Sequence, residues 1–238
     1  MQIQRATLES CAYAEGTVVV IDVLRAFTTA AFAFAAGAQE ILLVSSVDEA
    51  LAMREQIPGS LVMGEVKGLP VPGFDFSNSP AEIDGRDLSG RRLIQRTSSG
   101  TQGVILSQRA DIILTSSFVC ASATVNYLHK LDSQQVTLVN TGYRPPGGEE
   151  GWPVGLGTED EACADYIEAL IRNETPELEP FIHRVRESYS GRIFADPQYP
   201  EHSAVDLDYC TQVDRFDFAM RVYRQDGFLV MRAENSIA

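Results

Sequence analysis

Polar side chains that could bind a metal ion and a phosphate group follow directly after a strongly apolar run near the start of the chain. Asp22 comes after the run 18–21, Arg25 follows three residues later, and Thr28 and Thr29 lie in an expected helix. A carboxylate is a ligand for Mg²⁺, and an arginine and the free N–H groups of a helix N-terminus attract an anion. The alternative is structural: Asp22 caps the helix and pairs with Arg25, and the threonines fill its first turn.

A second candidate site for an anion is the turn that leads from an expected strand into an expected helix at residues 96–101. It consists of Arg96, Thr97, Ser98, Ser99, Gly100 and Thr101. Small hydroxyl residues and a glycine allow backbone N–H groups to surround an anion. The turn lacks the lysine of a Walker motif, so a plain capping turn is the other interpretation. Ser117, which follows the next strand, has the same two interpretations.

Acidic residues that could complete a metal site also lie after expected strands. They are Glu65, with Lys67 two residues on; Asp75, in the segment 73–80 that also holds Asn78; and the pair Glu159 and Asp160. Mg²⁺ takes one or two carboxylates and leaves the rest of its shell to water and substrate phosphate. Each acid also has an ordinary structural role available, because acids stabilise helix N-termini and are common on the surface of an acidic protein.

The elements that must position these residues alternate between strand and helix. Residues 17–21 are too apolar for a half-exposed strand, so we expect a strand buried on both faces of a parallel sheet. Expected strands span 17–21, 41–44, 61–63, 92–95, 112–114 and 136–139; expected helices span 24–36, 47–56, 101–109, 121–131 and 159–172. This order predicts an α/β fold, a three-layer α/β/α arrangement with a mainly parallel sheet built from successive βα units. Ligands of such sheets bind beyond the carboxyl ends of the strands, where the polar residues lie.

Three segments depart from the alternation. The Pro- and Gly-rich segment 68–90 is expected to be a long binding loop, and segment 145–157 a mobile lid or a surface excursion. Beyond residue 176 the periodicity weakens, and residues 196–238 are expected to pack on the sheet as a closing segment. Residues 1–238 are expected to form a single α/β domain, or two closely packed lobes.

The composition of the chain disfavours several classes of binding partner. The 238 residues include 19 Lys and Arg against 33 Asp and Glu, a formal charge of −14, which disfavours nucleic acid and anionic membranes. No targeting segment and no apolar run of membrane-spanning length is present, so we expect a cytoplasmic protein. The four cysteines are scattered singly and are expected to be reduced thiols. The haloacid dehalogenase DxD pattern, GxSxG, HExxH and GxGxxG after a strand are all missing.

Taken in order, several motifs resemble those of a known family. They are Val19-Val20-Ile21-Asp22-Val23-Leu24-Arg25-Ala26-Phe27-Thr28-Thr29, Gly64-Glu65, Gly73-Phe74-Asp75-Phe76-Ser77-Asn78-Ser79-Pro80, Thr97-Ser98-Ser99-Gly100-Thr101 and Glu159-Asp160. With them the sequence resembles the 2-phosphosulfolactate phosphatase family over residues 17–170. The resemblance implies a magnesium-dependent α/β phosphatase that converts (2R)-2-phospho-3-sulfolactate to 3-sulfolactate and phosphate, a step of coenzyme M biosynthesis. Four positions depart from the family pattern: Val66, Ser98, Ser99 and Cys120, all expected to border the ligand.

The residues and the resemblance together give a hypothesis with named roles. Asp22, Arg25 and Glu65 are the expected catalytic residues, and Asp22, Asp75, Glu159 and Asp160 the expected Mg²⁺ ligands. The expected substrate-binding residues are Thr28, Thr29, Lys67, Asn78, Arg96, Thr97, Ser98, Ser99, Gly100, Thr101 and Ser117. The attacking group is either a water molecule or a side-chain oxygen such as that of Asp22.

Two alternatives remain beside this hypothesis. The protein could hydrolyse another small phosphorylated hydroxy-acid or phosphate ester, because the four departures remove hydrogen bonds that select a substrate. It could also be a non-catalytic binding protein for an anionic metabolite. In each case the partner is a small anion, not nucleic acid or membrane, and a homodimer is one arrangement that the sequence leaves open.

Overall fold

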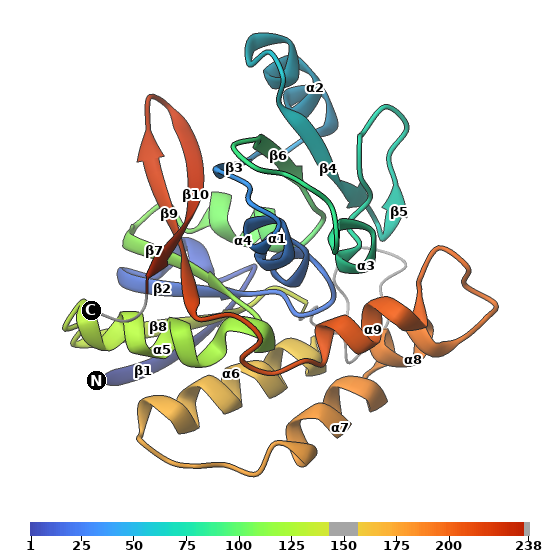
Figure 1. The fold of residues 1–238 in the computed structure, drawn as a ribbon. Helices are drawn as coiled ribbons and strands as arrows, with labels where there is room; N and C mark the ends of the chain where they lie inside the picture. The colour runs from blue at the N-terminus through green and yellow to red at the C-terminus, as the bar shows by residue number, and fades with distance from the viewer. Residues whose placement is uncertain (143–156, 236–238) are drawn as a thin grey trace.

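The described part of the protein is built around one mixed β-sheet with helices on both faces (Figure 1). The structure is a computed structural model, and it describes residues 1–142 and 157–235. Within these residues the strands follow the order β1–β8–β2–β7–β9–β10–β3–β6–β4–β5 across the sheet. The expected α/β fold with helices and a mostly parallel sheet is confirmed. Among the described residues, the helices are too short or too polar to cross a membrane.

The strands form two parallel groups. One group is β1 (Gln2–Thr7), β8 (Gln135–Asn140), β2 (Gly16–Ile21) and β7 (Ala110–Ser116); the other is β3 (Glu40–Leu43), β6 (Arg92–Arg96) and β4 (Leu61–Val66). Pairing is parallel throughout each group. The short β5 (Leu69–Pro70) pairs antiparallel with the outer edge of β4. The six strands expected from the sequence all lie in these groups. β1 was not predicted, because apolar and polar residues alternate only weakly along it.

A hairpin joins the two groups. β9 (Phe218–Gln225) pairs antiparallel with β7, β10 (Phe228–Asn235) pairs antiparallel with β9, and β10 pairs antiparallel with β3. The expectation that residues 196–238 pack on the sheet is wrong for this hairpin, which lies within the sheet. Asp226 and Gly227 have positive φ angles of 53° and 84°, as a tight turn requires, and Asp-Gly between two such runs is a strong hairpin sequence.

The first strand of the motif region is buried on both faces, as its composition predicts. Val18 and Val20 of β2 pack in the hydrophobic cluster around α1 (Ala26–Ala35), whereas Val19 and Ile21 pack in the cluster around α5 (Ala121–Lys130) and α6 (Thr158–Ile171). α2 (Val47–Gln56) contributes Ala50 and Met53 to a third cluster against Leu42 of β3. α4 (Gly100–Leu106) packs beside α1.

The remaining helices lie in the segments that departed from the alternation. α3 (Pro80–Ile83) and β5 interrupt the segment 68–90, which was expected to be one long loop. α7 (Glu179–Glu187), α8 (Tyr189–Ala195) and α9 (Ala204–Cys210) follow α6, and α9 contacts α3. Segment 145–156 of the expected lid lies outside the described residues. The packing of α8 and α9 beside α1 and α3 closes one side of the site described next (Figure 1).

Candidate functional site

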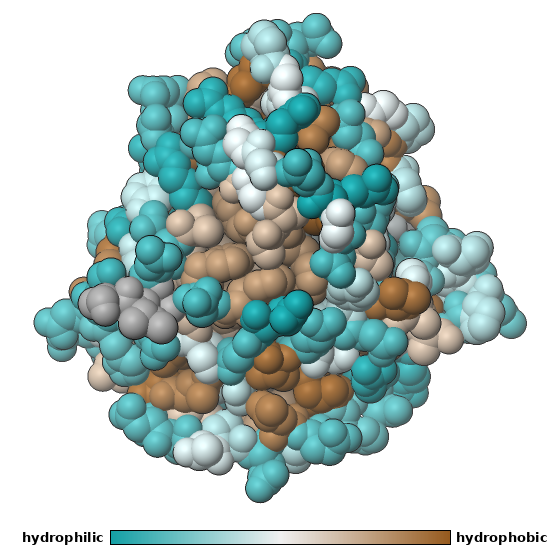
Figure 2. All heavy atoms as spheres, viewed as in Figure 1, coloured by the Kyte–Doolittle hydropathy of each residue, from teal (hydrophilic) through white to brown (hydrophobic). Residues whose placement is uncertain are grey.

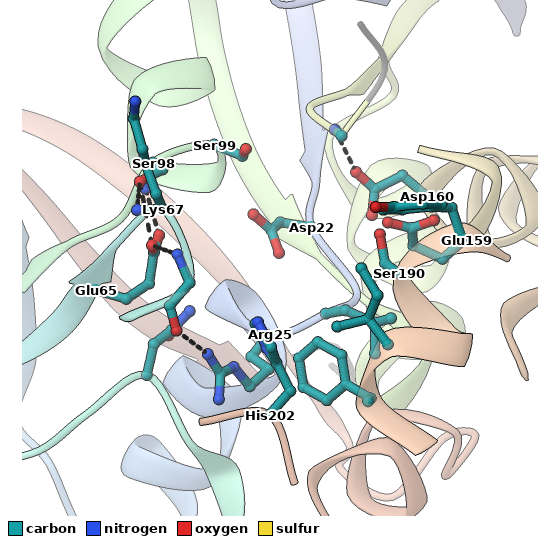
Figure 3. A pocket seen from close by; sticks show the side chains of 17 residues that line it. Asp22, Arg25, Glu65, Lys67, Ser98, Ser99, Glu159, Asp160, Ser190 and His202 are labelled. Atoms are coloured by element: carbon teal, nitrogen blue, oxygen red, sulfur yellow. Dashed lines mark hydrogen bonds between the residues drawn. The ribbon is translucent and has the colours of Figure 1, made fainter. Parts of the chain in front are cut away.

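A cavity of about 430 Å³ opens where β2, β4, β6 and β8 end and where α8 and α9 approach them (Figure 3). The following residues line it: Asp22, Leu24, Arg25, Glu65, Lys67, Gly68, Asn78, Ser98, Ser99, Gly142, Glu159, Asp160, Tyr189, Ser190, Ile193, Phe194 and His202. Nine of the residues predicted from the sequence line it: the acids Asp22, Glu65, Glu159 and Asp160, the cations Arg25 and Lys67, and the polar residues Asn78, Ser98 and Ser99. The ends of strands from both halves of the sheet, β2 and β8 on one side and β4 and β6 on the other, meet at this cavity.

Asp22 lies near the centre of the cavity and is only 6% exposed. One carboxylate oxygen accepts a hydrogen bond from the backbone N–H of Ala26, at 3.0 Å, in the first turn of α1, and the other accepts one from the Thr141 hydroxyl at 3.4 Å. Burial, and to a smaller extent the charges of Glu65 and Glu159, raise the pKa of Asp22 to about 6 against the lowering effect of the Ala26 N–H. Asp22 therefore caps the start of α1 and also lines the cavity.

Glu159 and Asp160 form a second acidic group in the first turn of α6. Asp160 accepts hydrogen bonds from the backbone N–H of Val23 at 2.8 Å and of Gly142 at 2.7 Å, so it joins α6 to the segment after β2. Glu159 is 5% exposed, and its Oε2 atom has no hydrogen-bond partner. Burial raises the pKa of both groups, and for Asp160 the nearby charges of Asp22 and Glu159 add to the shift. Mutual repulsion of buried carboxylates is relieved when a cation binds among them.

Glu65 faces these acids from the other side of the cavity but is occupied by protein donors. It accepts hydrogen bonds from the backbone N–H groups of Ser98 and Gly68, both at 2.5 Å, and from the Ser98 hydroxyl at 3.1 Å. Arg96 stabilises the same end of β4, because its guanidinium donates a hydrogen bond to the Glu65 carbonyl at 2.7 Å. Glu65 and Arg96 thus hold the ends of β4 and β6 together, and Arg96 does not line the cavity.

Arg25 is a buried cation in the wall of the cavity. Its two terminal nitrogens donate to Asp206 at 3.1 Å and to the Gly68 carbonyl at 3.0 Å, and its guanidinium lies 5.0 Å from the centre of the Phe194 ring. The pairing with Asp22 that the sequence offered as an alternative is absent from the described contacts; Asp206, on α9, is the partner. Lys67 also lines the cavity, with an exposed side chain and its backbone N–H bonded to Ser98.

The hydroxyl residues separate into lining and supporting groups. Ser98 and Ser99 line the cavity, and Figure 3 shows the Ser99 hydroxyl directed toward Asp22. Thr97 and Thr101 bond reciprocally through their side chains and backbone N–H groups, at 2.9 and 3.0 Å, and so cap the start of α4. The structure does not place the other predicted binding residues in the lining: Thr28, whose hydroxyl donates to Ser117; Thr29; Ser117; and Gly100, which instead backs directly onto Asp22.

Asp75 and Asn78 come from one motif but differ in position. Asp75 accepts a hydrogen bond from the Val62 N–H at 2.8 Å and pairs with Arg54 at 3.5 Å, so it stabilises the loop against β4 and does not line the cavity. Asn78 is 4% exposed, lines the cavity, and has an unpartnered Oδ1 atom. The structure thus brings the other predicted metal ligands, Asp22, Glu159 and Asp160, together without Asp75.

The sequence reasoning missed the part of the wall that α8 and the loop to α9 contribute. Tyr189, Ser190, Ile193, Phe194 and His202 line the cavity, although no motif marks them in the sequence. The charged partner of Arg25, Asp206, was missed for the same reason. These residues lie more than 150 positions after Asp22 in the sequence, and the packing of α7–α9 brings them to the cavity. Short-range spacing in the sequence cannot reveal such an approach.

The donor set fits Mg²⁺ held through a small number of carboxylates. Among residues 1–142 and 157–235, no three His, Cys, Asp or Glu side chains are grouped closely enough to form a metal site by themselves. Mg²⁺, however, commonly takes one or two carboxylates and fills its octahedral shell with waters and phosphate oxygens. The unpartnered Glu159 Oε2 and the raised pKa values of Asp22 and Asp160 are the features expected of such a site.

Comparisons with known proteins point to one family over most of the chain. The family model of 2-phosphosulpholactate phosphatase matches residues 2–225. A probable 2-phosphosulfolactate phosphatase of Bacillus subtilis is 35% identical over 88% of this chain and 87% of its own. Similar proteins of the same description occur in Carboxydothermus hydrogenoformans, 33% identical over 91% and 90% of the two chains, and in Synechocystis, 35% identical over 66% and 62%.

Proposed function

Because the chain belongs to the 2-phosphosulfolactate phosphatase family, a family of phosphoric monoester hydrolases, we propose that it hydrolyses (2R)-2-phospho-3-sulfolactate to 3-sulfolactate and phosphate. The observation that carries the proposal is the cavity in which buried acids face the cations Arg25 and Lys67. An acidic wall suits a metal-bound phosphate, and the cations suit a substrate with further negative groups. The product fits a role in coenzyme M synthesis, which the family resemblance implies and which is part of this proposal.

Mg²⁺ is the proposed cofactor, held by Asp22 with Glu159 and Asp160. When bound, it would neutralise charge on the phosphate and withdraw electrons from phosphorus. The protein's own residues supply orientation: Asp22 is fixed by Ala26 and Thr141, and Asp160 by Val23 and Gly142. These backbone donors hold the carboxylates in place before any ligand arrives, so little reorganisation is needed at the moment of reaction.

The remaining lining residues bind the substrate. Ser99 directs its hydroxyl toward Asp22, where it can donate to a phosphate oxygen. The Ser98 hydroxyl is held by Glu65 at the edge of the cavity, and Lys67 adds a positive charge at the mouth. The attacking group is water or the Asp22 carboxylate. Acid quenching of a reaction with ³²P-labelled substrate distinguishes them, because attack by Asp22 leaves label on the protein and attack by water leaves none.

The proposal is tested by phosphate release from 2-phosphosulfolactate and from a panel of other phosphate monoesters, with Mg²⁺ and with excess chelator. We expect release that depends on Mg²⁺ and a higher kcat/KM for 2-phosphosulfolactate than for the other esters. Saturable binding of the substrate without release under any metal and pH would instead identify a binding protein and overturn the proposal.

A second candidate substrate, another small phosphorylated hydroxy-acid, is favoured by the departures from the family pattern. Ser98 and Ser99, two of the four, line the cavity, so a changed hydrogen bond there acts directly on the ligand. Cys120 is fully buried beside Ser116 and Ser117 and, like Val66, does not line the cavity, so these two departures lie behind the site. A higher kcat/KM for such an ester in the same panel would identify that ester as the substrate of the same site.

A further inference from the structure

Polar atoms without a partner are concentrated around the cavity. In residues 1–142 and 157–235, eight buried side-chain nitrogen or oxygen atoms have no hydrogen-bond partner. Four of them belong to residues that line this one cavity: Arg25 Nε, Asn78 Oδ1, Glu159 Oε2 and His202 Nδ1. Leaving a buried polar atom unpaired costs free energy, so native proteins rarely do so without a reason. Their concentration indicates that a ligand supplies the partners.

The four atoms differ in what they need. Glu159 Oε2 and Asn78 Oδ1 accept, and the proposed metal ion satisfies Glu159 Oε2. Arg25 Nε always carries a hydrogen and can only donate, and His202 Nδ1 donates in the tautomer or the charged form that has its proton there. Arg25 Nε therefore calls for an acceptor, and His202 Nδ1 can donate to the same acceptor when it carries its proton there; next to a guanidinium the favoured acceptor is an anionic oxygen.

Arg25 and His202 are held in the same place by the same two residues. The Phe194 ring lies 5.0 Å from the Arg25 guanidinium and 4.8 Å from the centre of the His202 ring. On the other side, the Gly68 carbonyl accepts a hydrogen bond from Arg25, and a Cβ atom at Gly68 would lie 2.7 Å from His202 Cε1. Gly68 has a φ angle of 82°, so both its backbone shape and the nearness of His202 require glycine.

This pair is separate from the acidic group. Figure 3 shows Arg25 and His202 together on one side of Asp22, and Glu159, Asp160 and Ser190 on another. The terminal nitrogens of Arg25 are tied to Asp206 and Gly68, and the Asp206 side chain is only 1% exposed, so the guanidinium is fixed rather than free to follow the phosphate. A ligand whose phosphate lies against the acids and the metal would place its other end toward this pair.

We propose that His202 is a specificity-determining residue, which together with Arg25 binds an anionic group of the substrate other than its phosphate. This inference rests on the proposed function and adds to it, because His202 was not among the residues expected from the sequence. In 2-phosphosulfolactate the group is the carboxylate or the sulfonate, which share the chemistry of an anionic oxygen acceptor. Burial and the Arg25 charge lower the pKa of His202, and an anion bound at Nδ1 favours the proton on that atom.

The test compares esters that differ only in the remote anions. They are 2-phosphosulfolactate, 2-phospholactate, which lacks the sulfonate, 1-sulfopropan-2-yl phosphate, which lacks the carboxylate, and isopropyl phosphate, which lacks both. kcat and KM are measured for the wild type, for His202→Gln and for the matched control His183→Gln, an exposed histidine on α7. Thermal melting of each variant checks that it folds.

For His202→Gln we expect kcat/KM on 2-phosphosulfolactate to fall about tenfold to a hundredfold further than on isopropyl phosphate, as loss of a hydrogen bond to a charged group predicts. The excess loss should appear mainly in KM. If 2-phospholactate behaves like isopropyl phosphate, the bound group is the sulfonate; if 1-sulfopropan-2-yl phosphate does, it is the carboxylate. His183→Gln should match the wild type on all four esters.

Two results would overturn the inference: an equal loss on all four esters, or no loss on any. Gly68→Ala provides a second variant, because its Cβ atom must displace the His202 ring, and it should change the same ratio in the same direction. Failure of the proposed function is a distinct result, since the wild type would then release no phosphate from any ester. In that case calorimetric binding of 3-sulfolactate to the wild type and to His202→Gln still tests the anion site, and equal affinities would reject it.

Discussion

At the scale of single residues, the character of the cavity comes from carboxyl groups that are buried and close to one another. Asp22, Glu159 and Asp160 are each less than a tenth exposed, and burial raises the pKa of all three. Backbone N–H groups fix Asp22 and Asp160, so these acids cannot move apart to relieve their repulsion. Such an arrangement is unfavourable for the empty protein and favourable once a cation is bound, which is typical of a functional site.

Replacing Asp22 tests the metal and the chemistry together. In Asp22→Asn the side-chain oxygen can still accept from Ala26, but the charge is lost, so we expect kcat/KM for phosphate release to fall by about a thousandfold or more. The stabilisation of the protein by Mg²⁺ in thermal melts should shrink as well. Asp48→Asn, in the exposed first turn of α2, is the control for loss of one acidic charge. Unchanged turnover and Mg²⁺ stabilisation in Asp22→Asn would show that another residue does this work.

The raised pKa of Asp22 also predicts how stability depends on pH. Its folded pKa is about 6 against 3.8 for the free side chain, so the folded state binds the proton more tightly than the unfolded state. Stability of the metal-free protein should therefore fall as pH rises from about 4 to about 6, by roughly 3 kcal/mol from this residue. Urea unfolding in chelator at pH 4.5 and pH 7 measures roughly 2 kcal/mol of this change. The decrease should be smaller in Asp22→Asn, and an equal decrease in both proteins would contradict the assignment.

At the scale of elements, the site depends on how closely α4 approaches α1. Gly100 begins α4, and a Cβ atom there would lie 2.8 Å from the Ala26 Cβ and 2.9 Å from an oxygen of Asp22. Glu65 and Arg96 hold the ends of β4 and β6 in the same region. Gly100, expected from the sequence to bind the substrate, does not line the cavity and packs behind Asp22.

Gly100→Ala should lower both stability and turnover. In an ordinary helix this change stabilises by about 0.5–1 kcal/mol, but here the added methyl group pushes against Asp22 and α1. Gly85→Ala is the comparison, because its φ of 76° makes it strained while nothing lies within 4 Å of the added atom. We expect Gly85→Ala to lose stability with unchanged kcat, and Gly100→Ala to lose both. Normal kcat in Gly100→Ala would show that Asp22 tolerates the displacement.

At the scale of the whole molecule, the hairpin β9–β10 decides how the two parallel groups of strands meet. Three successive antiparallel pairings, β7–β9, β9–β10 and β10–β3, make β3 run opposite to β7 along the ladder. In a flat sheet the two groups would then end on opposite edges. Neighbouring strands twist by roughly 20–25°, and over several strands this twist turns the groups toward one another around α1. Figure 1 shows β9 and β10 crossing steeply relative to β2.

Because the hairpin pairs with a strand of each group, we expect the protein to unfold in one transition. Met220 and Met231 are fully buried in the cluster around α1, which draws on strands of both groups. Met231→Ala should destabilise by about 2–5 kcal/mol and keep a single transition, whereas Phe228→Ala, 36% exposed beside the turn, should cost far less. Hydrogen exchange and circular dichroism measure whether both groups lose structure together. Two separate transitions would support the two closely packed lobes that the sequence also allowed.

Formation of a homodimer stays a prediction. Figure 2 shows apolar residues gathered over the middle and lower part of the viewed face, among polar side chains. A homodimer would be detected by sedimentation at several protein concentrations.

Much of the fold and of the candidate site could be predicted because it depends on local patterns. The runs 17–21 and 136–139 are apolar enough to be buried on both faces, and the residue that follows such a strand lies at the sheet edge. Asp22, Glu65 and the 98–99 turn could be located in this way. The sequence could not show that Asp75 and Thr28, unlike these residues, do not line the cavity. A side chain that follows a strand can face either the cavity or the backbone of a neighbouring segment.

Side-chain type and short spacing account for the alternation of strands and helices, for the burial of β2, and for the acidic and hydroxyl residues at the strand ends. Tertiary structure alone decided that β9 and β10 lie between the two parallel groups, that Arg25 pairs with Asp206, and that Phe194 and His202 reach the cavity. The physical reason is that these contacts join residues up to about two hundred positions apart. Sheet twist and helix packing bring them together, and no local pattern encodes that distance.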